Sequence, residues 1–205
     1  MISDEQRDRL GTLYRIIDMH GENIPFDMTA HQKQMCSAIT GRDIWFSSRQ
    51  VGIDTFVTIL FLDECIHLGT DALYITTSNL QSEHLMRTVI ASIKDFTENE
   101  VIDVVRFDRF AITLRNNITD RKARLRFSVS VPSGAVSNLY ASCIDRYSYM
   151  KTEEVVTGAF NAVPNGRGKI IASLHGFQAH PRIADMIDNP EKFGFKVTSF
   201  VSIKR

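Results

Sequence analysis

Short apolar segments alternate along this chain with segments of helix length, and this alternation limits the possible folds more than any other feature. The strand-like segments cover residues 43–47, 72–76, 139–144 and 169–173. Strands that are apolar throughout are buried on both faces, which is typical of parallel sheets covered by helices. Helix-length segments at 54–68 and 79–96 separate the first strands. The sequence therefore predicts a three-layer α/β domain with a mainly parallel sheet flanked by helices.

The same periodicities predict the remaining elements. A helical period near the amino terminus is carried by Leu10, Leu13, Ile16 and Ile17. Thr29 is a good cap for a second helix over 31–39. Further strands are expected at 101–107, 111–114, 123–129 and 195–203, with helices at 152–163 and from Pro181 onward. In the predicted sheet, residues 44–47 and 139–144 are adjacent central strands.

The composition is that of a globular protein without an overall charge. The chain has 205 residues, 43% of them hydrophobic, and 24 basic residues balance 24 acidic ones. No net field therefore attracts nucleic acid or a membrane. No apolar stretch has the length of a membrane span, and the charged amino terminus is unlike a signal peptide, so a cytoplasmic protein is expected. Cys36, Cys65 and Cys143 form no CxxC pair and are expected to be reduced core thiols.

The loop after the first predicted strand partly matches a phosphate-binding loop. It reads Ser48-Arg-Gln-Val-Gly-Ile-Asp-Thr55, between a strand and a helix. Such a loop needs a glycine, a lysine for the phosphates and a Ser or Thr hydroxyl for magnesium. Gly52 is present, but Ile53 stands at the lysine position and Asp54 at the hydroxyl position. Taken alone, this pattern is also typical of an ordinary turn between a strand and a helix.

Over about residues 24–205 the chain resembles the ATPase domain of tailed-bacteriophage terminase large subunits, the motors that package viral DNA. The matching segments, in order, are 26–32, 48–55, 139–146 and 170–176. The resemblance implies an ASCE-type P-loop NTPase fold. It also implies nucleotide contacts by Gln32, Ser48, Arg49, Gln50, Gly52, Ile53, Asp54 and Thr55. Two further positions, Ser173 and His175, match the segment that couples hydrolysis to movement.

Four family positions that act on ATP are altered here. The phosphate lysine, the magnesium hydroxyl and the two carboxylates correspond to Ile53, Asp54, Asp145 and Arg146, so only the weak metal ligand Asp145 is retained. Because phosphoryl transfer depends on positioned charge, these changes favour an inactive relative with degenerate Walker A and Walker B motifs and no cofactor. The alternative is a divergent ATPase that uses ATP and Mg²⁺ and in which Arg49 and Arg146 supply compensating charge.

Basic residues are concentrated between Arg106 and Arg126, where seven of them accompany two acidic ones. This excess makes a modest candidate for contact with the DNA backbone, through Arg121, Lys122, Arg124 and Arg126. The alternative is a solvated hairpin face. The histidines show no spacing typical of metal ligands.

The expected organisation is one terminase ATPase-like domain over 1–205, with residues 1–23 as a helical extension and no nuclease domain. Whether the chain is a free-standing protein or part of a longer one stays open. The leading hypothesis is a pseudo-ATPase that contacts phage packaging proteins, such as a terminase or portal, or DNA, in genome packaging or in interference with it. The alternatives are a divergent packaging ATPase and an unrelated regulatory module with a P-loop fold.

Overall fold

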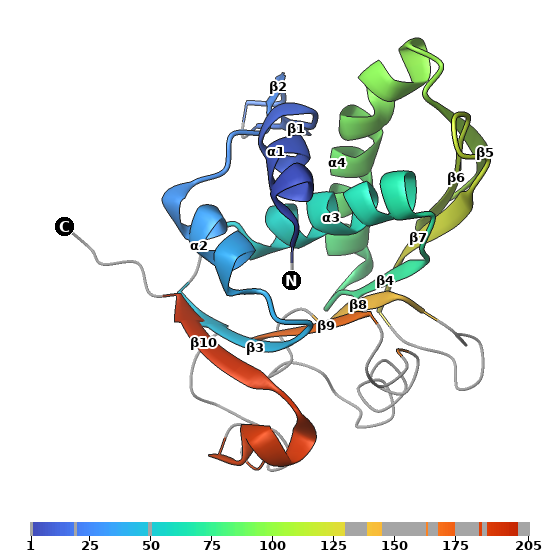
Figure 1. Ribbon diagram of the computed structural model, residues 1–205. Coiled ribbons are helices and arrows are strands. Elements are labelled where there is room, and N and C mark those ends of the chain that lie inside the picture. The colour runs from blue at the N-terminus through green and yellow to red at the C-terminus, as the bar shows by residue number, and fades with distance from the viewer. Residues whose placement is uncertain are drawn as a thin grey trace.

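The computed structural model describes residues 2–18, 20–48, 51–129, 139–144, 163, 168–174, 185 and 188–200, and these form a mixed sheet with helices packed on it (Figure 1). The sheet has eight strands in the order β10-β3-β9-β8-β4-β7-β6-β5. In chain order the strands are β3 (Arg42–Ser47), β4 (Ala72–Ile75), β5 (Ile102–Asp108), β6 (Ala111–Asn116), β7 (Lys122–Ser128), β8 (Ala141–Ile144), β9 (Lys169–Leu174) and β10 (Lys196–Phe200).

The sheet is mainly parallel, as predicted. All pairings from β10 through β3, β9, β8 and β4 to β7 are parallel, whereas β5 and β6 continue the sheet as antiparallel strands. The predicted adjacency of β3 and β8 is wrong, because β9 lies between them and pairs with both. Strand order is decided by the path of the crossover connections, which the apolar pattern of each strand does not encode.

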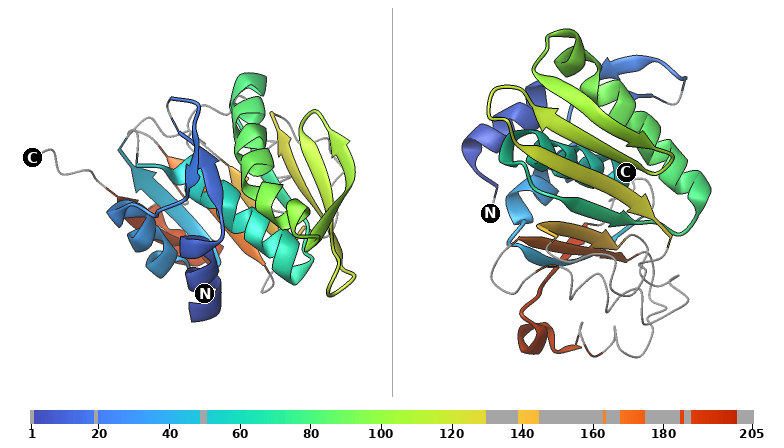
Figure 2. Two further views of the ribbon diagram at one scale, coloured as in Figure 1. Left: turned by 90° about the horizontal axis from the view of Figure 1, so that it is seen from above. Right: turned by 90° about the vertical axis from the view of Figure 1, so that its right-hand side faces the viewer.

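In the part of the chain that the structure describes, four α-helices lie on the same side of the sheet (Figures 1 and 2). They are α1 (Asp4–Thr12), α2 (Ala30–Ala38), α3 (Ile53–Asp63), which continues as the π-helix η1 (Glu64–Leu68), and α4 (Asn79–Glu98). The predicted helices over 31–39, 54–68 and 79–96 are thereby confirmed. The helices expected over 152–163 and from Pro181 lie outside the described residues, and a short 3-10 helix, η3, covers Pro190–Phe193.

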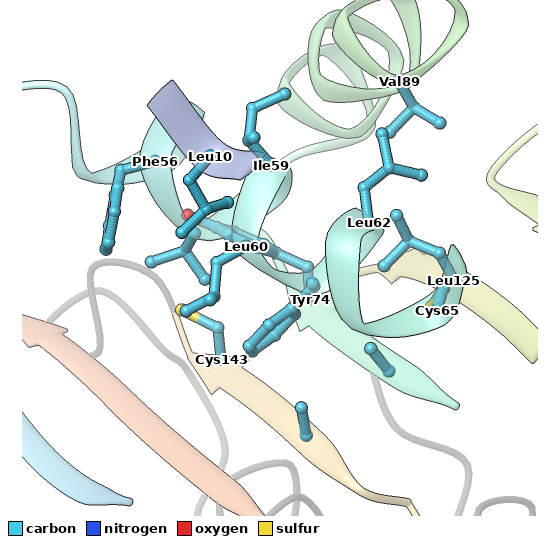
Figure 3. Packing of buried hydrophobic residues seen from close by; sticks show 14 of the residues in the cluster. Leu10, Phe56, Ile59, Leu60, Leu62, Cys65, Tyr74, Val89, Leu125 and Cys143 are labelled. Atoms are coloured by element: carbon cyan, nitrogen blue, oxygen red, sulfur yellow. The ribbon is translucent and has the colours of Figure 1, made fainter. Parts of the chain in front are cut away.

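Helix α3 forms the centre of the core. Every residue of α3 except Asp54 and Thr55 is buried, which fits a helix covered both by the sheet and by outer helices. Tyr74 and Cys143 are register partners on β4 and β8, and Figure 3 shows them with Leu60 of α3 in one apolar cluster. Cys36, Cys65 and Cys143 are buried and are in no disulfide, as expected. No helix within the described residues is long and apolar enough to cross a bilayer.

The amino-terminal prediction is wrong in part. The first helix ends at Thr12, and Arg15–Ile17 forms strand β1, which pairs antiparallel with β2 (Asn23–Pro25). Residues 1–23 are therefore not a purely helical extension. The β-branched Ile16 and Ile17 suit a strand better than a helix, and the hairpin gives their backbone groups partners.

A buried ion pair fixes α1 to the end of α3. The Arg9 guanidinium donates to both carboxylate oxygens of Asp63, from Nε and Nη2 at 2.9 Å each. The Tyr14 hydroxyl donates to Asp63 Oδ1 at 2.8 Å. Asp63 is completely buried, so its charge depends on these donors. The hydrogen bond to Asp63 raises the pKa of Arg9, while burial raises the pKa of the Tyr14 hydroxyl.

A second buried pair ties the π-helix to the sheet. Lys169, the first residue of β9, donates to Glu64, the first residue of η1, and both side chains are buried. Burial raises the pKa of Glu64, and the charge of Lys169 opposes this rise. The two adjacent carboxylates at the end of α3 are therefore neutralised from different directions, Asp63 by α1 and Glu64 by β9.

Replacing Arg9 with leucine should destabilise the fold strongly. Arg9→Leu leaves the buried Asp63 carboxylate without its charged partner, so we expect a loss of about 3 to 5 kcal/mol in the free energy of unfolding, measured by urea denaturation. Lys94→Met is the control, because Lys94 pairs with Glu98 on the exposed face of α4. That change should cost less than about 0.5 kcal/mol. Equal losses in the two variants would contradict the anchoring role of Arg9.

His67 should make the fold sensitive to acid. Its Nε2 lies 3.7 Å from Asp63 Oδ1, and burial lowers its pKa, opposed by the Asp63 charge and assisted by Arg9. The unfolded chain therefore binds a proton more readily than the folded one, and stability falls as pH drops below about 6.5. We expect His67→Gln to flatten the pH dependence of the unfolding free energy between pH 7 and 5. His20→Gln, at an exposed site, should not; an unchanged slope in His67→Gln would refute the assignment.

Candidate functional site

The turn between β3 and α3 has the predicted strand, glycine and helix. β3 ends at Ser47, and α3 begins at Ile53 directly after Gly52. Gly52 has φ +79°, in the left-handed region that favours glycine, and its carbonyl accepts the first helical hydrogen bond from Phe56 at 3.0 Å. The Ser48 amide donates to the Phe200 carbonyl of β10 at 3.1 Å. Arg49 and Gln50 lie outside the described residues.

Gln32 holds this turn through its side-chain amide. Its Nε2 donates to the Gly52 carbonyl at 3.0 Å, and its Oε1 accepts from the Thr29 amide at 2.8 Å. Thr29 Oγ1 in turn accepts from the Gln32 amide, which completes a capping box at the start of α2. Gln32 is only 4% exposed. The residue that the resemblance assigns to nucleotide contact therefore uses both ends of its amide within the protein.

The side chain of Ile53 belongs to the apolar core. It is 2% exposed and is a member of the main cluster of buried hydrophobic residues. A lysine at this position would have to leave the core to reach a phosphate. Ile53 thus contributes to the packing of α3 in the core.

Asp54 connects three elements. The Tyr74 hydroxyl of β4 donates to Asp54 Oδ1, and Gln81 Nε2 of α4 donates to Asp54 Oδ2, each at 3.2 Å. Asp54 lies in the first turn of α3, where the helix dipole stabilises a negative charge. The carboxylate therefore occupies the helix end that would otherwise attract an anionic ligand. Sequence reasoning missed Tyr74 and Gln81; the only available signal was that a tyrosine in a buried strand needs a partner for its hydroxyl.

A cavity of about 560 Å³ adjoins Asp54 at the start of α4. Its lining combines hydroxyls, both signs of charge and an exposed leucine: Asp54, Thr77, Ser78, Leu80, Gln81, Glu83, His84 and Arg87. Apart from Asp54, none of these residues was singled out in the sequence. No group of three or more His, Cys, Asp or Glu side chains in the described part of the chain could hold a metal ion.

The carboxyl ends of neighbouring parallel strands meet beside this turn. Ser173 of β9 is fully buried and lies in register with Trp45 of β3. β8 ends at Ile144 and β9 at Leu174. The candidate residues that follow these strand ends, Asp145, Arg146 and His175, lie outside the described residues. Ser48 and Thr55 are half-buried on either side of Gly52.

The basic residues of β7 share one face of the sheet, but several are engaged within the protein. Lys122, Arg124 and Arg126 alternate with the buried Ala123, Leu125 and Phe127. Arg124 pairs with Asp108 at 2.8 Å, and Arg121 donates to the Leu68 carbonyl at 3.2 Å. Elsewhere in the cluster Arg106, Arg109 and Arg115 pair with Asp108, Glu83 and Asp120. Contact with DNA stays a prediction, and these carboxylates offset much of the local positive charge.

Replacing Gly52 with alanine should displace Gln32. A Cβ at Gly52 would lie 2.6 Å from Gln32 Nε2, and the alanine would also be strained at φ +79°. Gly21→Ala is a matched control, because Gly21 has φ +84° with open space around the added Cβ. We expect Gly21→Ala to cost about 1 to 2 kcal/mol and Gly52→Ala at least about 1 kcal/mol more, by denaturant unfolding. The excess should vanish in a Gln32→Ala background; equal costs at the two glycines would contradict this contact.

Structural comparison identifies relatives of the fold, although neither a protein-family model nor a curated protein matches the sequence. The large terminase ATPase domain of Thermus phage P74-26 superposes with a TM-score of 0.64 at 13% identity, covering 98% of this chain and 86% of that domain. The large terminase of another thermophilic bacteriophage gives 0.59 at 12% identity, covering 85% of this chain and 46% of that longer one. The UvsW helicase of bacteriophage T4 gives 0.58 at 11% identity over 97% and 68%. The chain therefore has the P-loop ATPase fold of phage large terminases, a fold also found in a phage helicase.

Proposed function

We propose that this chain is a terminase-like pseudo-ATPase, whose nucleotide site has been converted into part of the protein core. The observation that carries the proposal is the first turn of α3. Ile53 is buried at the phosphate-lysine position, and Asp54, at the magnesium-hydroxyl position, accepts hydrogen bonds from Tyr74 and Gln81. Ile53 packs in the apolar core and Asp54 is held by hydrogen bonds within the protein, so neither side chain is available to a ligand.

The charge at this turn also disfavours the binding of a nucleotide. ATP with magnesium needs positive charge and a hydroxyl at the helix start, because the triphosphate is strongly anionic. Asp54 places a carboxylate there, which repels phosphate. Gln32, which would have to turn outward to reach a nucleotide, would then lose its hydrogen bonds to Thr29 and Gly52. Nucleotide binding would therefore have to overcome both repulsion and the loss of internal contacts.

A domain of this kind would act by contact rather than by hydrolysis. We infer a role in phage genome packaging, or in interference with it, in which the terminase-like surface binds a packaging protein such as a terminase or portal. DNA is the other candidate partner. Lys122 is exposed on β7 and Arg126 lies on the same face of that strand, so these two residues are the first to test.

A divergent active ATPase is the second candidate. Within the described residues, the left-handed Gly52 and the helix start at Ile53 match the glycine and the helix start of a phosphate loop. Arg49 and Arg146 would have to replace the missing lysine and carboxylate in this reading. Release of phosphate from ATP by the wild-type protein would favour this candidate over the first.

Restoring the family residues should restore nucleotide binding. We expect wild-type protein to bind Mg-ATP with a dissociation constant above about 100 µM, and Ile53→Lys/Asp54→Thr to bind at about 10 µM, by calorimetry. Ile53→Met/Asp54→Thr is the matched control: it removes the carboxylate without supplying the ammonium, and it should bind more weakly than the lysine variant. Hydrolysis should require Arg146→Glu in addition, because the second carboxylate acts on the attacking water.

Thermal unfolding must accompany these titrations, because Ile53→Lys introduces an ammonium group at a buried position. Low-micromolar affinity in the wild type would overturn the pseudo-ATPase proposal. A folded double variant without any gain in affinity would show that the turn is not a modified phosphate site.

A further inference from the structure

Strand β5 is an open edge of the sheet. It is the last strand in the sheet order, and within the described residues β6 is its only strand neighbour (Figures 1 and 2). Natural edge strands are commonly protected by charged side chains, especially lysine, by proline or by a bulge. β5 contains charged residues and a bulge but no lysine or proline, and it exposes three large apolar side chains, Val104 (42%), Val105 (49%) and Phe107 (54%). These features favour an edge that another strand covers.

A bulge in β5 sets which side chains share a face. In the register with β6, Asp103 pairs with Arg115 and Arg106 pairs with Thr113. Between these two pairs the register shifts by one residue, at Val105. Because Arg115 and Thr113 lie two residues apart, Asp103 and Arg106 lie on one face although they are three residues apart. By the same argument Ile102, Val104 and Phe107 lie on the other face, opposite Asn116, Leu114 and Ile112.

This arrangement makes β5 complementary to itself. If two copies pair antiparallel about a twofold axis between Val104 and Val105, Asp103 of each copy faces Arg106 of the other on one side of the sheet. Ile102 faces Phe107 on the opposite side, and the valines meet at the axis. Without the bulge these partners would fall on opposite faces. A closed twofold interface has this reciprocity, in which residue i meets j and j meets i.

We propose that two copies of this chain associate through β5, forming a continuous antiparallel sheet across the dimer. The charges favour a second copy as the partner. An antiparallel copy of β5 places its Arg106 opposite Asp103 and its Asp103 opposite Arg106, which an unrelated strand would match only by chance. Asp103 is exposed and makes no ion pair with any described residue. Arg106 uses Nε for Asp108 at 3.0 Å, so its terminal amino groups are left to reach Asp103 of the second copy. This inference does not depend on the proposed function.

The dimer should be weak, because one seven-residue strand per copy forms the interface. Interfaces of such small size are typical of transient complexes. We expect a dissociation constant of about 10 to 100 µM, measured by sedimentation equilibrium of the full chain.

Charge reversal gives the decisive test. Asp103→Arg and Arg106→Glu should each weaken dimerisation at least about tenfold, since each places like charges opposite one another twice. An equimolar mixture of the two variants should form a heterodimer, because every cross-pair is then again Asp with Arg or Arg with Glu. The double variant Asp103→Arg/Arg106→Glu should dimerise within about threefold of the wild type. Asp8→Arg, at an exposed position of α1, is the matched control and should leave dimerisation unchanged.

Circular dichroism should show that every variant is folded, since both positions are exposed. A wild-type chain that stays monomeric at about 500 µM, well above the expected dissociation constant, would overturn the proposal. A dimer that Asp103→Arg does not weaken, or single variants that fail to rescue each other, would also overturn it, because the interface would then lie elsewhere.

Discussion

The burial of helix α3 against a parallel sheet is the constraint on which the rest of the structure depends. The charged groups at the ends of an apolar helix in this position need hydrogen-bond or ion-pair partners inside the protein. Asp54 at its start is held by Tyr74 and Gln81, while at its end Asp63 is held by Arg9 and Tyr14. Glu64, one residue further, pairs with Lys169. The contacts of α3 thus fix the positions of α1, α4, β4 and β9.

Because α3 is buried, the residues of the candidate site at its start also pack and hydrogen-bond within the core. In a nucleotide-binding turn the first helical residues face a ligand, and the ligand supplies the compensating charge. Here the protein supplies the partners itself, through the hydroxyl of Tyr74 and the amide of Gln81. Gln32 does the same for the Gly52 carbonyl. Within the described part of the turn, Gly52 and Asp54 have hydrogen-bond partners from the protein itself, and this is the physical basis for the pseudo-ATPase proposal.

The edge of the sheet presents the opposite situation. At β5 the described structure leaves apolar side chains exposed and one strand edge without a neighbour. The bulge between Val104 and Arg106 is a feature that can protect an edge strand from pairing, and it also brings Asp103 and Arg106 onto one face. Within the described residues, the start of α3 thus has its partners inside the protein, whereas β5, which takes no part in that turn, exposes apolar side chains at the edge of the sheet.

Sequence alone determined the elements whose pattern is local. The apolar runs of β3, β4, β8 and β9 and the helical period of α4 follow from burial, and the Thr29 cap and Gly52 turn follow from backbone chemistry. The fold resemblance also rested on local motifs such as Ser48 to Thr55. Tertiary structure alone decided the insertion of β9 between β3 and β8, the hairpin at Arg15–Ile17, and the partners of Asp54 and Asp63. The partners of the two carboxylates lie 20 to 54 positions away along the chain, and no local periodicity records which distant donor will reach each carboxylate.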